Sequence, residues 1–167
     1  STLVVELLEE LLEAGFPART ALEMMNTALV IGREEIRFST IDISIFDLYE
    51  GTVDILKAGA STTFIRHQNG VERICSTNLP LGVIQDLEIQ SVHKHLQSGD
   101  FVIMITDGIM DALPVREQEF LLDTIIRGTS LNNPKEMAHH ILEQVLEWTG
   151  EEPMDDMTVL VVGIWRI

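Results

Sequence analysis

The sequence contains almost no cysteine. Cys75 is the only cysteine among 167 residues, so no disulfide can form within the chain. A single thiol is typical of a reducing compartment, so we expect a cytoplasmic location, although a longer parent protein could carry a membrane anchor. Leu81 stands six residues after Cys75, where a cysteine-based phosphatase loop would need an arginine. We therefore interpret Cys75 as a buried structural thiol.

Basic residues and long apolar runs are also scarce. Eleven Lys and Arg residues face 27 Asp and Glu residues, which gives a net charge of −16. This charge would repel a phosphate backbone, so we expect no nucleic-acid partner. No apolar run approaches the ~20 residues that cross a bilayer, and no signal peptide follows Ser1, so we expect no membrane contact by this segment. The excess acid fits plain solubility or divalent-cation binding, and composition leaves both open.

Several catalytic patterns are missing as well. The chain has no G-x-S-x-G motif, no P-loop and no dinucleotide fingerprint. His93 and His95 would share one face of a strand, but no third zinc ligand is evident. His139 and His140 are adjacent on a predicted helix, so their side chains diverge. We interpret these histidines as polar surface residues.

The first 32 residues predict a helical hairpin. Leucines and glutamates occupy opposite faces over residues 3–14, and this helix should end at Gly15. Pro17 can open a second helix at its first turn, which should run to Gly32. The predicted apolar faces consist of Leu3, Leu7, Leu8, Leu11 and Leu12 in the first helix, and Ala21, Leu22, Met25, Ala28 and Leu29 in the second.

A sequence pattern typical of β-strands begins at Phe38. Alternating β-branched residues predict strands within residues 38–51, 52–59, 62–76 and 86–96. Asn69-Gly70 is a strong signal for a two-residue hairpin turn, and Glu50-Gly51 is a weaker one. Because strands joined by such short turns must be antiparallel, a doubly wound nucleotide-binding fold is disfavoured.

The second half of the chain predicts a further strand, two helices and a last strand. The apolar run after Asp100 forms the first strand, and helices should follow at about 115–127 and 134–148, the second capped by Asn133. The "TVLVV" of the last strand, within residues 155–167, is apolar enough to lie centrally in a sheet. We predict one α+β domain over residues 1–167, with the hairpin at 1–32 and the sheet and helices at 37–167.

Aspartates stand at the ends of two predicted core strands. "MITDG" places Asp107 after one strand, and "DDMTVLVV" places Asp155 before another. Such carboxylates are held by rigid backbone yet remain accessible, and Gly108 allows a sharp turn or the close approach of a ligand. Asp-Gly is also an ordinary turn dipeptide, so either motif alone is weak. If the strands are neighbours, Asp107 and Asp155 could converge on magnesium or manganese.

Five blocks, in order, carry a resemblance to a known family. They are "FSTIDISIFDL", "KAGASTTFIR", "STNLPLGVI", "GDFVIMITDGIMDA" and "DDMTVLVV". Together they resemble the metal-dependent serine/threonine protein phosphatases of the type 2C superfamily, and within it the phosphatase domains of the stage II sporulation protein E family. The match runs from about Phe38 to Ile164. It implies an antiparallel β-sandwich flanked by helices.

The resemblance also implies a chemistry. Family members use two manganese or magnesium ions to activate a water that attacks phosphoserine or phosphothreonine, so no enzyme nucleophile is required. By position, Asp107 and Asp155 match metal ligands of the family. Asp156 replaces the more general asparagine and is expected around the ligands, while Asp111 matches a frequent second acid that could support the metal shell or an extra ion. The implied substrate is a phosphorylated anti-anti-sigma factor in sporulation or a stress response.

In the family, the other key ligands lie on strands that precede the helical hairpin. One of them is the aspartate of an Asp-Gly motif that bridges the two metals. Before Asp42 this chain contains no aspartate. We therefore expect an N-terminally truncated domain that lacks its first strands, holds part of the metal site and is impaired or inactive by itself.

Two alternatives stay open. The chain could be a non-catalytic regulatory module of a sporulation or stress signalling protein, with a homodimer or partner interface on the hairpin of residues 1–32. It could also be a phosphoaspartate enzyme that uses Asp107 as acceptor. The short hairpins argue against the usual parallel sheet of such enzymes, and Ile109 stands where an Asp-x-Asp motif would need its second acid.

Overall fold

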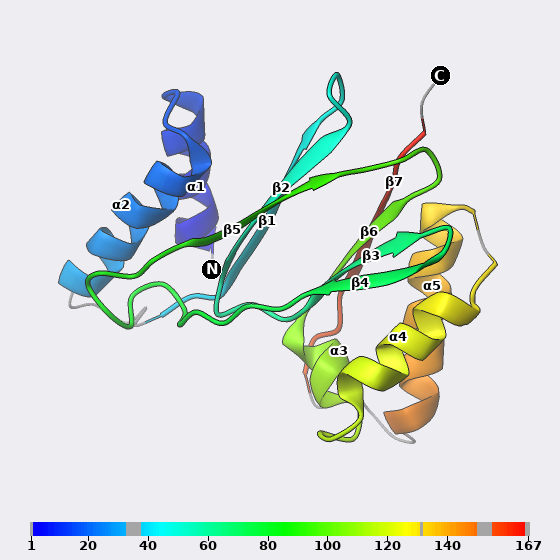
Figure 1. The fold of residues 1–167 in the computed structure, drawn as a ribbon. Coiled ribbons are helices and arrows are strands. Elements are labelled where there is room, and N and C mark those ends of the chain that lie inside the picture. Colours follow the sequence, from blue (N-terminus) through cyan, green and yellow to red (C-terminus); the bar gives the residue numbers. More distant parts are fainter. Residues whose placement is uncertain (1, 33–37, 131, 150–154, 166–167) are drawn as a thin grey trace. The chain divides into compact units, whose positions relative to one another are not determined.

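Two compact units make up the chain. The structure, a computed structural model, describes residues 2–32, 38–130, 132–149 and 155–165. The first unit comprises Ser1–Ala60 and Ser76–Lys94, and the second comprises Ser61–Cys75 and His95–Ile167. Helices and antiparallel hairpins occur in both units, which confirms the predicted α+β class (Figure 1).

The predicted helical hairpin is confirmed. Helix α1 spans Thr2–Glu13 and helix α2 spans Ala18–Ile31. Gly15 lies between them with a φ of 88°, a conformation that glycine adopts without steric cost. Pro17 is the N-cap of α2 rather than a residue of its first turn, and its carbonyl oxygen accepts a hydrogen bond from the Ala21 N–H at 2.9 Å.

The buried face of the hairpin differs from the prediction at three positions. Val4 is buried, whereas Leu12 is 39% exposed and Ala28 is exposed. At about 100° per residue, Val4 falls in the middle of the arc that the five predicted leucines span and Leu12 falls at its edge, so the contact face is narrower than predicted. The side chain of Leu3 lies outside the described residues. The first core consists of Val4, Leu22, Met25, Ile41, Leu56, Ala58, Leu81, Leu87 and Ile89.

A buried polar side chain joins α2 to the loop around residue 84. The Asn26 side chain is 2% exposed. Its amide nitrogen donates to the carbonyl oxygens of Ile84 and Gln85, both at 2.9 Å, and its oxygen accepts from the Gly82 N–H at 2.8 Å. Because its polar atoms are bonded to backbone, Asn26 is tolerated inside an apolar core.

The sheet of the first unit has the order β1-β2-β5. Strands β1 (Ile41–Asp47) and β2 (Thr52–Ala58) pair antiparallel in an unbroken register. Strand β5 spans Gln90–His95. Inside the β1–β2 pair, the fully buried Lys57 ammonium donates to Asp42 Oδ2 at 2.5 Å.

The β1–β2 hairpin is confirmed, but its loop has four residues, 48–51, rather than the predicted two, because Asp47 pairs with Thr52. Asp47 Oδ1 accepts hydrogen bonds from the backbone N–H groups of Tyr49 and Glu50, at 2.8 and 2.9 Å. Gly51 follows with a φ of 67°. The glycine is needed here because the turn ends in the left-handed region.

The sheet of the second unit has the order β4-β3-β6-β7. Its strands are β3 (Thr63–His67), β4 (Gly70–Ile74), β6 (Phe101–Ile105) and β7 (Val159–Gly163). All three pairings are antiparallel. The prediction of a central last strand is wrong for the described residues, because β7 pairs with β6 alone and lies at the sheet edge. Residues 166 and 167 lie outside the described residues.

The β3–β4 hairpin is confirmed, but its turn lies one residue earlier than predicted. His67 pairs with Gly70, so Gln68 and Asn69 are the two turn residues. An Asn-Gly turn of the predicted kind needs positive φ at both residues. No described residue other than glycine has a positive φ, and Gly70 is not among the glycines that do. Gly70 therefore serves as the first residue of β4.

Three helices complete the second unit. Helix α3 (Asp107–Asp111) was not predicted, whereas α4 (Gln118–Gly128) and α5 (Pro134–Thr149) lie close to the predicted ranges. The Asn133 cap is confirmed, since its Oδ1 accepts from the backbone N–H groups of Lys135 and Glu136 at 2.9 and 3.2 Å.

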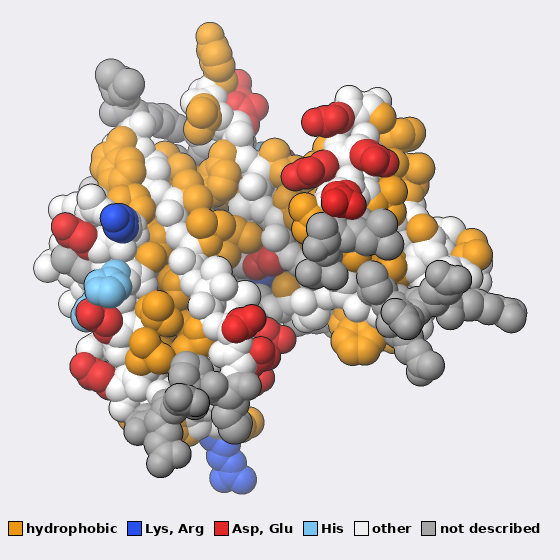
Figure 2. Space-filling view, turned by 180° about the vertical axis from the view of Figure 1, so that it is seen from behind, with side chains coloured by type: hydrophobic (Ala, Val, Ile, Leu, Met, Phe, Trp, Pro, Cys, Tyr) orange, Lys and Arg blue, Asp and Glu red, His pale blue; other side chains and the backbone are white. Residues whose placement is uncertain are grey.

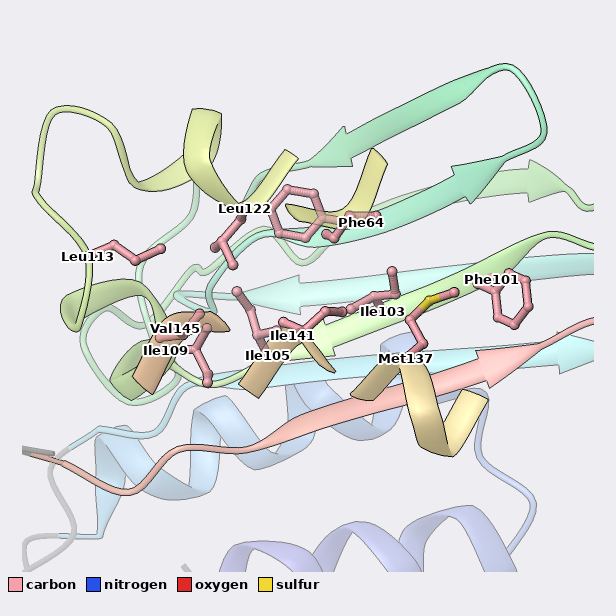
Figure 3. Packing of buried hydrophobic residues seen from close by; sticks show 11 residues of the cluster. Phe64, Phe101, Ile103, Ile105, Ile109, Leu113, Leu122, Met137, Ile141 and Val145 are labelled. Atoms are coloured by element: carbon pink, nitrogen blue, oxygen red, sulfur yellow. The ribbon is translucent and has the colours of Figure 1, made fainter. Parts of the chain in front are cut away.

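The second core lies between this sheet and the helices, as Figure 3 shows. Strands β3 and β6 supply one wall, and α3, α4 and α5 supply the other. The core consists of Phe64, Phe101, Ile103, Ile105, Ile109, Leu113, Leu122, Ile126, Met137, Ile141 and Val145.

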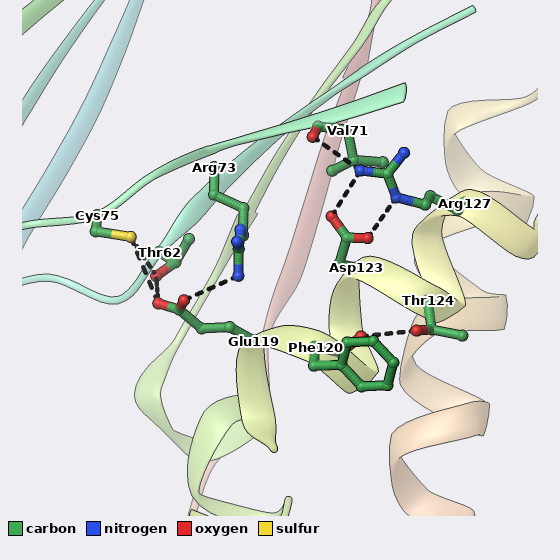
Figure 4. Close-up of polar contacts among 9 residues, drawn as sticks. All are labelled: Thr62, Val71, Arg73, Cys75, Glu119, Phe120, Asp123, Thr124 and Arg127. Carbon is green, nitrogen blue, oxygen red and sulfur yellow. Dashed lines mark hydrogen bonds and ion pairs between the residues drawn. The ribbon is translucent and has the colours of Figure 1, made fainter. Parts of the chain in front are cut away.

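The interpretation of Cys75 as a buried thiol is wrong. Strand β4 ends on the buried Ile74, and the next side chain, that of Cys75, is exposed. Its thiol donates to Glu119 Oε1 at 3.4 Å (Figure 4). The cysteine therefore lies on the surface of the second unit.

Two of the four histidines interpreted as polar surface residues pair with acids. His93 Nδ1 lies 2.7 Å from Asp54 Oδ1, and His139 Nε2 lies 3.1 Å from Glu143 Oε1. Figure 2 shows acidic and hydrophobic side chains mixed on one face of the molecule. Among the described residues, no helix is both long and apolar enough to cross a membrane.

Candidate metal centre

Strands β6 and β7 bring the two aspartate motifs to the same end of one sheet. They pair antiparallel, with Ile105 opposite Val159 and Phe101 opposite Gly163. The end of β6 therefore lies beside the start of β7. Asp107 follows the first by two residues, and Asp155 precedes the second by four. The neighbouring strands that the sequence motifs required are thus present.

Two threonines fasten the motifs to each other. The Thr106 N–H donates to the Thr158 carbonyl oxygen at 3.1 Å, and the Thr158 N–H donates to the Thr106 hydroxyl oxygen at 2.9 Å. The Thr106 hydroxyl donates to the Asp156 carbonyl oxygen at 3.3 Å. These bonds extend the β6–β7 pairing past the strand ends, so the backbone beside both aspartates is fixed.

Gly108 packs directly on the second motif. It is buried in α3, and a Cβ atom at this position would lie less than 3.0 Å from the carbonyl oxygen of Asp156. Its φ is not positive, so glycine is required by the close approach of backbone and not by a turn. The neighbour at this position is the Asp155–Asp156 backbone rather than a ligand.

The two predicted ligands are exposed carboxylates on this fixed backbone. Asp107 is the first residue of α3, with Thr106 as the N-cap. Asp155 Oδ1 accepts from the Asp156 N–H at 2.7 Å. Both side chains are open to solvent. A cation could therefore reach them without any rearrangement of the core.

Asp111 and Asp156 lie near the same place by chain geometry. Asp111 is the last residue of α3, four residues after Asp107, and residues four apart are neighbours on a helix surface. Asp156 follows Asp155 and contributes its backbone carbonyl to the Thr106 hydroxyl. At these positions they would add negative charge around a cation held by Asp107 and Asp155.

Asp107 and Asp155 have the ligand chemistry that part of a metal site would need. Magnesium keeps several waters and is commonly held by one or two carboxylates, and manganese prefers the same oxygen ligands. Asp107 and Asp155 supply such a pair. Within residues 2–32, 38–130, 132–149 and 155–165, no three or more His, Cys, Asp or Glu side chains group closely enough to hold a metal ion. The described residues therefore place two exposed carboxylates at adjoining strand ends and show no complete metal site.

Sequence reasoning missed Thr106 as a residue of this site. Threonine is common in β-strands, so a threonine at the end of an apolar strand does not indicate a functional site. Its position directly before Asp107, opposite the threonine of "DDMT", was the available hint. Helix α3 was missed because five residues are too few to show a helical period.

Comparisons with solved structures define the class of fold. A Bacillus subtilis structure of the PP2C phosphatase domain with a fragment of the regulatory domain of SpoIIE matches with a TM-score of 0.88 and 31% identity, covering 98% of this chain and 49% of that one. The SpoIIE phosphatase domain from the same organism, presoaked with manganese, matches with a TM-score of 0.76 and 29% identity, covering 100% and 76%. The chain therefore has the α+β fold of a PP2C-type phosphatase domain.

Sequence comparisons define the family. The family model of stage II sporulation protein E (SpoIIE) matches residues 1–165, so the chain belongs to this family. Stage II sporulation protein E of Bacillus subtilis strain 168 is 32% identical over 161 residues, which cover 96% of this chain and 20% of that protein. Phosphoserine phosphatase RsbU of the same strain is 22% identical, covering 93% and 48%. The chain thus spans a fifth to a half of the length of these relatives.

Proposed function

We propose that this chain is part of a manganese- or magnesium-dependent protein phosphatase that removes phosphate from phosphoserine or phosphothreonine of a regulatory protein. The observation that carries the proposal is the Thr106–Thr158 bonding, which holds Asp107 and Asp155 at adjoining strand ends. Family membership and the PP2C-type fold support the reaction class. We propose that both units belong to one phosphatase domain, of which this chain is a part.

The chain's own residues would prepare the site in three ways. The Asp107 and Asp155 carboxylates would hold the cation, while Asp111 and Asp156 would add negative charge around them. The hydrogen bonds of Thr106 and the Gly108 contact would fix the backbone that carries the two carboxylates. When bound, the cation would supply Lewis-acid activation of water and neutralise phosphoryl charge. Manganese is the ion with which a similar phosphatase domain was presoaked.

We propose a phosphorylated anti-anti-sigma protein as the substrate and the cytoplasm as the location. The similarity to a phosphoserine phosphatase, RsbU, supports phosphoserine as the reacting group. The net charge of −16 argues against nucleic acid as the phosphate source, because a polyanion would be repelled along its whole length.

The test is manganese-dependent phosphate release from a phosphoserine anti-anti-sigma protein. It compares this chain with a longer polypeptide that covers the whole phosphatase domain, since this chain covers 76% of one such domain. We expect release by the longer form, reduced at least about 100-fold by Asp107→Asn or Asp155→Asn. Asp86→Asn, at an exposed aspartate of the first unit, is the matched control and should leave release unchanged.

Calorimetric titration with manganese gives a readout that does not depend on turnover. Asp107→Asn and Asp155→Asn should each weaken manganese binding in the longer form, while Asp86→Asn should not. Full phosphate release by both site variants would remove the assignment of Asp107 and Asp155 as ligands. Absence of both manganese binding and phosphate release in the longer form would reject the phosphatase proposal.

A second candidate function is a partner interface on the helical hairpin, a homodimer contact in its simplest form. Val5 and Leu12 are 52% and 39% exposed and lie seven residues apart, on one side of α1. Phe16, directly after this helix, is 41% exposed. If the hairpin forms a dimer, Val5→Glu together with Leu12→Glu should give a monomer in sedimentation velocity. A monomeric unmodified chain at high concentration would reject the homodimer.

A further inference from the structure

The turn before α4 and the start of α4 expose two large apolar side chains and a guanidinium. Val115 is 84% exposed and Phe120 is 69% exposed, and Arg116 lies between them in the chain. We refer to Val115, Arg116 and Phe120 as the docking surface. Two large apolar side chains this exposed within one six-residue segment form a candidate contact site for another molecule.

The turn that carries Val115 and Arg116 is rigid. The Glu117 N–H donates to the Pro114 carbonyl oxygen at 2.8 Å, so Val115 and Arg116 are the two central residues of a closed turn. Leu113, directly before the turn, is 2% exposed and belongs to the second core. Because both ends are fastened, the outward direction of Val115 and Arg116 is built into the fold.

Helix geometry holds Phe120 outward as well. Phe120 lies two residues, or about 200°, from the fully buried Leu122 on α4. The neighbouring Glu119 is tied to the sheet, because Oε2 accepts from Arg73 at 3.1 Å and Oε1 accepts from the Thr62 hydroxyl at 3.1 Å. Figure 4 shows Phe120 on the side of α4 away from these contacts. Phe120 therefore cannot enter the core without breaking them.

A second tie fixes the other end of this helix. Arg127 donates to both carboxylate oxygens of Asp123 and, at 3.3 Å, to the Val71 carbonyl oxygen on β4. The hydrogen bond with Asp123 raises the pKa of Arg127 above its ordinary value. The surface is thus presented by a helix that is attached to the sheet at both ends.

The docking surface and the candidate metal centre share one continuous segment of the second unit. Helix α3 begins at Asp107, and the Leu113 N–H donates to the Met110 carbonyl oxygen at 3.0 Å, which carries the chain directly into the turn. A protein that presents a phosphorylated side chain to Asp107 would therefore meet this turn with its neighbouring surface.

Charge indicates which kind of partner fits. Among the described cations of the second unit, Arg73 and Arg127 bind carboxylates and Arg66 lies over the Phe101 ring, whereas Lys135 on α5 forms no ion pair with a described residue. Arg116 forms no ion pair with any described residue. In a chain of net charge −16, an accessible guanidinium is a local point of attraction for an acidic partner. Glu117 follows it, so the turn is neutral rather than acidic.

We propose that Val115, Arg116 and Phe120 dock the phosphoprotein substrate, with apolar contacts to Val115 and Phe120 and an acidic side chain of the substrate on Arg116. This inference rests on the proposed function and adds a substrate-binding surface outside the metal centre. Docking at this surface orients the substrate protein, and the phosphorylated side chain then reaches Asp107 and Asp155.

The test measures binding of a phosphorylated anti-anti-sigma protein to the 167-residue chain by calorimetry, with EDTA present so that no turnover occurs. Val115→Ser, Phe120→Ser and Arg116→Glu should each raise Kd about tenfold, as loss of a central interface residue does. Trp148→Ser and Lys135→Glu are the matched controls on α5, both at exposed positions, and should leave Kd within about twofold. The Arg116→Glu variant should also show a weaker dependence of Kd on salt.

Turnover separates the failure of docking from the failure of the proposed function. In the longer polypeptide, the three docking variants should raise KM for the phosphoprotein and leave hydrolysis of p-nitrophenyl phosphate unchanged. If the longer form hydrolyses both substrates but the docking variants match the controls, the docking proposal is overturned and the phosphatase proposal stands. If the longer form hydrolyses neither, the phosphatase proposal fails.

Other occupants of the surface give different results. If the chain sediments with phosphatidylglycerol vesicles and Val115→Ser or Phe120→Ser abolishes this, while phosphoprotein binding is unchanged, the surface contacts lipid and the proposal is overturned. If the same variants convert a dimer into a monomer without changing phosphoprotein binding, the surface joins two copies of this chain, and the proposal is likewise overturned.

Discussion

Gly108 and Asp156 are in direct backbone contact, although 48 positions separate them in the sequence. A Cβ atom on Gly108 would lie less than 3.0 Å from the Asp156 carbonyl oxygen and 3.5 Å from the Asp155 carbonyl carbon. Both neighbours are backbone atoms, which cannot rotate away as the end of a flexible side chain can. The absence of a side chain at residue 108 is therefore a condition for placing the two aspartate motifs side by side.

Gly108→Ala should lower the free energy of unfolding by about 1–3 kcal/mol, the usual cost of inserting atoms into packed structure. The measurement is urea denaturation followed by circular dichroism. Gly128→Ala is the matched control, because Gly128 is also a helical residue, the last of α4, and nothing lies within 4 Å of its added Cβ. Equal stability of the two variants would show that the Gly108 contact is loose.

Thr106→Val should lower the free energy of unfolding by about 0.5–1.5 kcal/mol, because its hydroxyl no longer accepts from the Thr158 N–H or donates to the Asp156 carbonyl. Thr106→Ser keeps the hydroxyl and should recover most of this loss. Valine and threonine have nearly the same shape, so the comparison isolates the hydrogen bonds. Thermal denaturation of the three proteins measures the effect. Identical melting of the valine and serine variants would contradict it.

Much of the helical architecture could be predicted because it depends on local sequence. The hairpin helices follow from periodicity, and the Asn133 cap follows from a side chain that bonds nearby backbone N–H groups. The β3–β4 turn was predicted one residue too late. The Asn-Gly signal assumes positive φ at Asn69, whereas Gly70 pairs with His67 and so belongs to β4. Local propensity identified the hairpin but not its register.

The candidate site could be predicted only in part for a related reason. Apolar composition marks β6 and β7 as buried strands, but it does not tell which strands lie beside them, and β7 is an edge strand. Asp107 and Asp155 stood out because carboxylates interrupt apolar runs. Thr106 did not, because its role depends on Thr158, which is distant in sequence and close only after β6 and β7 pair.

Lys57→Met should lower the free energy of unfolding by about 3 kcal/mol, because it leaves the Asp42 carboxylate buried without its ammonium partner. The Asp42 side chain is 13% exposed, so water relieves only part of this cost. The double variant Lys57→Met with Asp42→Leu removes both charges and should recover at least half of the loss. Urea denaturation of the single and double variants gives the coupling. A double variant as unstable as the sum of the two single variants would show that the pair contributes no direct interaction.

Asn133→Ala should lower the free energy of unfolding by about 1 kcal/mol, since two backbone N–H groups at the start of α5 lose the side-chain oxygen that accepts from them. Asn132→Ala is the matched control, because the preceding asparagine is exposed and lies outside the cap.

Asn133→Asp should be at least as stable as the native chain at neutral pH, because a carboxylate both caps the helix and interacts favourably with the positive end of its dipole. This advantage should disappear below about pH 4, where the introduced carboxyl is protonated. Thermal melting at pH 7 and pH 3.5 measures both effects. If the melting temperature of Asn133→Asp relative to the native chain were the same at both pH values, the dipole argument would be contradicted. The hydrogen-bonded cap is tested separately by Asn133→Ala.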